Sequence, residues 1–151
     1  MSESKKKSDK EMDVGDVTAF IGPFSARMTE EKVKLGDTVF TLKALSSTQI
    51  IEIYNLATDS KGVINPLKRS EGYLRFGIVA IDGAYDMDGN AVKDLMESVK
   101  LNGKEYPAMR SEGIAMLHPD VFNHLYSKID AISHLTEGER KKLDFIIPSP
   151  N

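Results

Sequence analysis

Apolar and polar residues alternate along the stretch KVKLGDTVFTLKAL, as they do in half-buried β-strands. The apolar positions are Val33, Leu35, Phe40 and Leu42. Between the two alternating runs stands the pair Gly36-Asp37, whose composition is typical of a tight turn. The stretch therefore predicts a β-hairpin. A second hairpin is predicted in VKLNGKEYP, because Asn102-Gly103 is a pair that type I′ turns favour.

The pattern changes to a helical period in SSTQIIEIYNLATDS. Ser46 and Gln49 have the spacing of a capping box, in which the two residues satisfy each other's backbone N–H groups at a helix start. The apolar residues that follow recur at helical intervals and are Ile50, Ile53, Tyr54 and Ala57. We expect a helix with one apolar face here.

A second helix is expected to begin at Asn65-Pro66, because asparagine caps helices well and proline suits the first helical position. The residues on or near its apolar stripe are Leu67, Leu74, Ile78 and Ile81. The helix is thus predicted to run through FGIVAIDGAY towards an exit at Asp82-Gly83. Gly77 costs about 1 kcal/mol of helix propensity relative to alanine, which indicates close packing against a neighbour.

The stretch DMDGNAVKDLME admits two interpretations. Its residues at positions 1, 3, 5, 9 and 12 match the ligand order of an EF-hand calcium loop, and they are Asp86, Asp88, Asn90, Asp94 and Glu97. However, Ala91 stands where such a loop needs glycine, Lys93 would place a cation beside the ion, and Asn102-Gly103 predicts a turn where the outgoing helix should run.

We therefore favour a polar turn that ends in an N-cap at Asn90. An amphipathic helix would follow, with its apolar face formed by Val92, Leu95, Met96 and Val99. The calcium-dependent binding module remains an alternative, and no metal site is assigned.

From Arg110 onward the chain is predicted to be helical again, with Pro119 in a first turn. A broad apolar face follows and consists of Val121, Phe122, Leu125, Tyr126, Ile129 and Ile132. Thr136 and Glu139 form another capping box, which predicts a short helix in TEGERKKLDF. Pro148 and Pro150 then end it.

Together these elements predict an α+β fold, a mainly helical single domain with two short β-hairpins. Residues 1–13 are polar and are expected to form a flexible N-terminal tail, residues 14–147 a single globular domain, and residues 148–151 a C-terminal tail. A chain of 151 residues is of ordinary size for one domain.

Composition narrows the classes of function. The chain has no cysteine, which excludes disulfides and thiolate metal sites. Its 20 basic and 23 acidic residues give a net charge of −3, without the basic excess expected of a nucleic-acid-binding protein. No run approaches the ~20 apolar residues that span a bilayer, and no apolar segment follows the N-terminal lysines as in a secretory signal. We expect no nucleic acid and no membrane among the partners.

No motif marks a catalytic centre. His118, His124 and His134 are not spaced as metal ligands on a helix and are expected to be surface or capping residues. Neither a nucleophile elbow nor a glycine-rich phosphate loop is present in the sequence. The chain is therefore expected not to be an enzyme, with no catalytic residues and no cofactor.

Three stretches resemble the tail-assembly chaperones of long-tailed bacteriophages. They are VFTLKALSSTQIIEIYNLATDS, a strand leading through a polar cap into a helix; LRFGIVAIDGAYDMDG, a helix closing on a glycine turn; and FNHLYSKIDAISHLTEGERKKLDF, two helices joined at an LT step. They cover roughly residues 33–145. The VKLNGKEYP hairpin is similar to baseplate-hub assembly proteins of contractile-tailed phages, which share parts of this layout.

The resemblance implies a protein-binding role in virion assembly. Family members keep the long tape-measure protein soluble, help to recruit tail-tube subunits and are usually absent from the finished particle. The expected place of action is then the cytoplasm of the host bacterium. A structural component of the tail or baseplate, located in the virion tail, is the alternative, and association as a homo-oligomer stays open. The candidate partner-binding residues are Phe145, Ile146 and Ile147, an apolar run near the C-terminus.

Overall fold

The computed structural model describes residues 30–134. The chain divides into two units, of which Glu30–Ser133 is one; the other comprises Met1–Thr29 and His134–Asn151. The account below concerns the first unit. The predicted tails at residues 1–13 and 148–151 and the helix predicted after Thr136 lie outside the described residues.

The first predicted hairpin is confirmed. Strands β2 (Glu30–Leu35) and β3 (Thr38–Lys43) pair antiparallel, with Leu35 opposite Thr38 across the turn. Gly36 has a φ of 63°, a left-handed conformation that glycine adopts without steric cost. On its other side β3 pairs antiparallel with β4 (Ile78–Asp82), so the sheet has the order β2-β3-β4.

Both predicted helix starts are confirmed. Helix α2 (Ser47–Ala57) begins with a complete capping box between Ser46 and Gln49. Helix α3 (Pro66–Gly77) begins after Asn65, whose Oδ1 accepts hydrogen bonds from the backbone N–H groups of Leu67 and Lys68. These caps satisfy N–H groups that have no partner inside the helix.

The prediction that this second helix continues through FGIVAIDGAY is wrong. Helix α3 ends at Gly77 and β4 begins at Ile78. Ile78, Val79 and Ile81 are β-branched residues, which pack well on a pleated sheet and are restricted in a helix. Pairing with β3 therefore outweighs the helical spacing of Ile78 and Ile81.

The helix predicted after Asn90 is also absent, and this segment instead holds a strand. Strands β5 (Met96–Leu101) and β6 (Lys104–Met109) form the second predicted hairpin, a separate two-stranded sheet. Asn102 and Gly103 have φ values of 52° and 79°, the conformation of a type I′ turn. Such a turn needs a strand before it, and this requirement overrides the helical spacing of Leu95, Met96 and Val99.

The predicted fold class requires a corresponding correction. The described residues are 41% helical and 31% strand, in four helices and two small antiparallel sheets. The domain is thus a mixed α+β fold and is not mainly helical. The extra strand content comes from β4 and from the length of the second hairpin.

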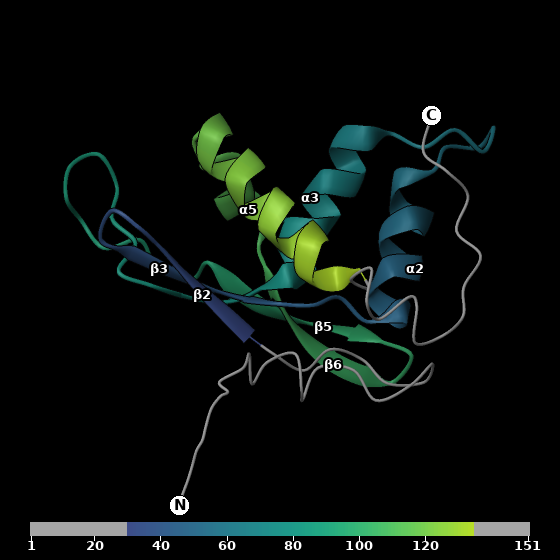
Figure 1. Ribbon diagram of the computed structural model, residues 1–151, viewed down its shortest axis with the longest axis horizontal. Coiled ribbons are helices and arrows are strands. Elements are labelled where there is room, and N and C mark those ends of the chain that lie inside the picture. The colour runs from purple at the N-terminus through teal and green to yellow at the C-terminus, as the bar shows by residue number, and fades with distance from the viewer. Residues whose placement is uncertain (1–29, 135–151) are drawn as a thin grey trace, which may run out of the picture. The chain divides into compact units, whose positions relative to one another are not determined.

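The last two helices within the described residues are α4 (Ser111–Ala115) and α5 (Pro119–Ser133). In Figure 1, α2, α3 and α5 lie on one side of the strands, and α3 contacts both of the others. One core joins these helices to both sheets. Its largest fully buried side chains are Leu42, Ile53, Leu74, Ile78, Met109, Leu125 and Ile129.

Candidate functional site

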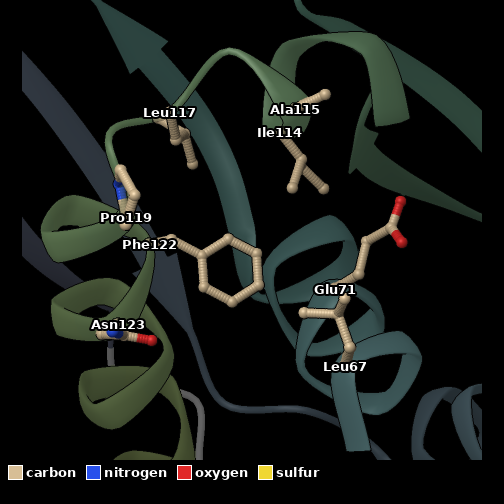
Figure 2. Close-up of a pocket in the computed structure, with 8 residues that line it drawn as sticks. All are labelled: Leu67, Glu71, Ile114, Ala115, Leu117, Pro119, Phe122 and Asn123. Carbon is tan, nitrogen blue, oxygen red and sulfur yellow. The ribbon is translucent and has the colours of Figure 1, made fainter. Parts of the chain in front are cut away.

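An apolar groove opens between α3, α4 and α5. It encloses about 400 Å³. We call it the α3–α5 groove and define it by its lining residues, which are Leu67, Glu71, Ile114, Ala115, Leu117, Pro119, Phe122 and Asn123 (Figure 2). Six of the eight are apolar, and a pocket of this size lies within the range of roughly 300–1,000 Å³ that binding sites occupy.

The floor of the groove is held in place by the core. Ile114 is buried, and Phe122 is half-buried against the core cluster, so both side chains are fixed by packing. Figure 2 shows the Phe122 ring projecting from α5 into the space between α3 and α4. Gly113 lets α4 approach closely, since a Cβ there would lie 2.8 Å from Leu95 Cδ2. The groove is therefore preformed.

The rim of the groove is exposed. Leu67 stands in the first turn of α3, where the Asn65 cap fixes the helix start, and 69% of its surface is accessible to solvent. The sequence pattern placed Leu67 on or near the apolar stripe of this helix, and the structure shows that this end of the stripe is exposed. Exposed leucine beside an apolar floor is a feature of surfaces that bind other molecules.

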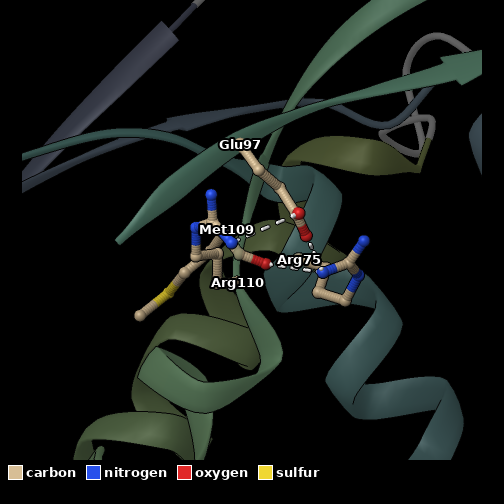
Figure 3. Close-up of polar contacts among 4 residues, drawn as sticks. All are labelled: Arg75, Glu97, Met109 and Arg110. Carbon is tan, nitrogen blue, oxygen red and sulfur yellow. Dashed lines mark hydrogen bonds and ion pairs between the residues drawn. The ribbon is translucent and has the colours of Figure 1, made fainter. Parts of the chain in front are cut away.

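Among the described residues, Glu71 contributes the only charged side chain to the groove lining. It follows Leu67 by four residues, so the two lie one turn apart on the same face of α3. Glu71 makes no hydrogen bond or ion pair with any other described residue. The basic residue one turn further on, Arg75, is engaged elsewhere, because its Nη1 donates to Glu97 at 2.8 Å and to the Met109 carbonyl at 3.0 Å (Figure 3).

The apolar surface continues beyond the groove. Leu117 also lines a smaller pocket of about 140 Å³, together with Tyr85, Val92, Leu95 and Met116. Tyr85 and Met116 are exposed, and Met87 is fully exposed in the loop that carries Tyr85. Methionine is a flexible, polarisable side chain that suits adaptable binding surfaces. The two pockets thus share the side chain of Leu117.

The residues of the hypothetical calcium loop have other partners. The Asp86 carboxylate accepts the backbone N–H groups of Asp88 and Asn90, both at 2.9 Å, and so closes a local turn. Gly89, with φ 81°, takes the sharp bend, whereas Ala91 pairs in a bridge with Tyr85. Asn90 caps no helix, contrary to the prediction. Glu97 lies on β5 and binds Arg75.

Asp94, the ninth residue of that loop, has a φ of 59°, a left-handed conformation that aspartate tolerates better than most residues. Within residues 30–134 no group of three or more histidine, aspartate or glutamate side chains is arranged to hold a metal ion. The spacing that matches an EF-hand in sequence is thus used here for a turn followed by a strand.

The histidines behave differently from one another. His118 precedes α5, and its Nδ1 accepts the backbone N–H of Asp120 at 3.1 Å, so it acts as the predicted cap. His124 and His134 are both exposed. The candidate partner-binding residues Phe145, Ile146 and Ile147 lie outside the described residues.

A second polar cluster, which sequence reasoning missed, lies between the helices. The rings of Tyr73 on α3 and Tyr126 on α5 have centroids 5.3 Å apart. Burial, followed by the negative charge of neighbouring groups such as Tyr54 and Asp130, raises the pKa of Tyr73 to about 12. Within the described part of the chain, the buried Arg69 Nε has no hydrogen-bond partner. This cluster belongs to the helix packing and opens into no pocket described above.

No protein-family description, curated protein or solved structure matches the chain. Among the helices of residues 30–134, none has both the length and the apolar character required to cross a bilayer.

Proposed function

We propose that this protein acts in bacteriophage tail assembly, as a chaperone or adaptor that binds other tail proteins through an apolar surface. The observation that carries the proposal is the α3–α5 groove, with buried Ile114 and half-buried Phe122 beneath the exposed Leu67. The sequence resemblance to tail-assembly chaperones supports the choice of client. A long helical tape-measure protein exposes apolar stripes before the tail tube encloses it, and a helix can lay such a stripe into a groove between helices.

The proposal places the protein in the cytoplasm of the host bacterium while tails are built. Its role there is to cover the client reversibly and not to transform a small molecule. The groove is suited to this role because its lining is mainly apolar and carries one carboxylate and one amide, Glu71 and Asn123. Weak and reversible contact is expected from a surface of this small size.

The test is co-expression of the full chain with a phage tape-measure protein, the proposed client, followed by co-purification. Leu67→Asp should abolish or strongly reduce capture, because a charge on the rim opposes burial of an apolar stripe. Ile51→Asp is the matched control: Ile51 is 61% exposed, lies on α2 and does not line the groove, so this variant should still capture the client. Equal capture of the client by both variants would show that the α3–α5 groove is not the binding surface.

A second measurement separates an assembly factor from a structural component. Peptide mass spectrometry of purified virions should find the chain absent or far below one copy per tail. Abundance equal to that of the tube or baseplate subunits would replace the chaperone role with the structural one.

A further inference from the structure

The α3–α5 groove combines an apolar lining with one carboxylate, that of Glu71, which makes no hydrogen bond or ion pair to another described residue. We propose that its occupant is an amphipathic helix carrying a lysine or arginine one turn away from an apolar residue of its stripe, and that Glu71 selects this basic residue. The inference rests on the proposed function and goes beyond it by stating the chemistry of the segment that is bound.

Spacing supports a helical occupant. Leu67 and Glu71 are four residues apart on α3, which places them about 6 Å apart along the helix axis. A second helix lying along α3 presents side chains at the same interval. One apolar residue can then contact Leu67 while a basic residue one turn away reaches Glu71.

Charge supports a basic residue. Glu71 lines the groove without a hydrogen bond or an ion pair to any described residue. Arg75, which could neutralise Glu71 from the next turn, is held by Glu97 at 2.8 Å. On its other side Glu71 lines a second pocket with Lys68 and Arg75, but neither makes an ion pair with it within the described residues. Its carboxylate therefore stays open to a cation on the partner.

Partial burial increases the effect of this charge. Glu71 is half-buried beside the apolar lining, and an occupying helix would exclude more water from it. A carboxylate covered without a counter-charge loses hydration, whereas one that meets a lysine or arginine regains a charged partner. Glu71 should thus discriminate between partners more than it adds to affinity.

The experiment uses three designed peptides of about 20 residues, long enough to form a helix. They share one leucine stripe and differ at a single site, one turn away from a central leucine. This site is Lys, Gln or Glu in the three peptides. Binding to the full chain is measured by fluorescence anisotropy at low and high salt. We expect the Lys peptide to bind roughly two- to five-fold more tightly than the Gln peptide, with the Glu peptide weakest, and the differences to shrink in salt.

Three variants of the chain make the test specific. Glu71→Lys should reverse the order of the peptides, and Glu71→Gln should make their affinities nearly equal. Asp88→Lys is the matched control, because it changes the net charge by the same amount in an exposed turn that does not line the groove. It should leave the order unchanged.

Several outcomes would overturn the inference. Equal affinities for the Lys and Glu peptides, or the same order in Glu71→Lys as in the parent, would exclude selection by Glu71. Self-association of the parent that is lost in Leu67→Asp would identify a second copy of the chain as the occupant. The proposed function is judged separately by capture of the tape-measure protein, so either idea can fail while the other stands.

Discussion

The Arg75 guanidinium on α3 and the Glu97 carboxylate on β5 form an ion pair of 2.8 Å that joins a central helix to the second sheet. The same Nη1 binds the carbonyl oxygen of Met109, the last residue of β6, so one guanidinium contacts both strands of the hairpin (Figure 3). Glu97 was the twelfth residue of the hypothetical calcium loop, and its carboxylate is instead used to hold the two layers together.

Acid should weaken this connection. The hydrogen bond from Arg75, and then the positive charges of Arg75 and Arg110, hold the pKa of Glu97 below its usual value against the opposing effect of desolvation. Because the unfolded chain binds a proton at Glu97 more readily, the stabilisation is complete above the ordinary glutamate pKa and is lost as pH falls through the lowered value. Urea unfolding across this acidic range should show the parent and Glu97→Gln converging in stability.

Glu112→Gln serves as the control for this titration, since Glu112 lies exposed on α4 and has no ion pair within the described residues. It should follow the parent at every pH. A gap between the parent and Glu97→Gln that stays constant from neutral to acidic pH would contradict the assignment.

Gly77 should not tolerate a side chain. A Cβ at this position would lie 2.5 Å from Ile129 Cγ2, so Gly77→Ala is expected to lower the free energy of unfolding by about 1–3 kcal/mol, as overpacking does. Helix propensity alone predicts the opposite sign, a gain of about 1 kcal/mol. Chemical denaturation decides between them. In an Ile129→Ala background the cost of Gly77→Ala should fall, and an unchanged cost would show that Ile129 is not the obstacle.

Two leucines offer a matched comparison of burial. Leu125 on α5 has no exposed surface, whereas Leu56 on α2 is 65% exposed. Leu125→Ala should cost about 2–5 kcal/mol through lost burial and a residual cavity. Leu56→Ala should change stability by no more than about 0.5 kcal/mol. Similar thermal unfolding temperatures for the two variants would be incompatible with this core.

Tyr73 should ionise late. Its pKa of about 12, raised first of all by burial, means that its phenol stays protonated where ordinary tyrosines lose the proton near pH 10. The unfolded state then loses its proton first, so the stability that this group contributes is present below about pH 10 and declines as pH rises towards 12. Absorbance titration of tyrosinate in the parent and in Tyr73→Phe measures this directly. If Tyr73→Phe removed a tyrosinate step near pH 10 and left the step at the highest pH in place, the raised pKa of Tyr73 would be refuted.

Local chemistry in the sequence located two helix starts and the turn of the second hairpin, although the cap predicted at Asn90 starts no helix. Ser46 with Gln49, Asn65 with Pro66, and Asn102 with Gly103 each act through atoms within a few residues, and all three appear as predicted. Prediction from the spacing of apolar residues failed where the same residues fit both a helical and a strand period. Ile78 and Val99 satisfy a helical spacing, yet pairing with β3 and with β6 puts them in strands.

The groove could not be predicted for a related reason. Leu67 and Phe122 are far apart in the chain, and only the packing of α3 against α5 brings them to one surface. Nor does the sequence reveal that Glu71 makes no ion pair with another described residue, because Arg75 stands at the ideal spacing for a pair on the same helix. The choice of Arg75 for Glu97 instead depends on where β5 lies.

The direct junction between α3 and β4 has a mechanical consequence. Gly77 ends the helix and Ile78 begins the strand, so no loop residue separates the two elements. The Ile78 N–H still donates a hydrogen bond to the Leu74 carbonyl. A client bound to α3 should therefore also restrain β4, which begins at the next residue. Amide exchange along Ile78–Asp82 should consequently slow when the α3–α5 groove is filled, although that strand contributes no residue to it.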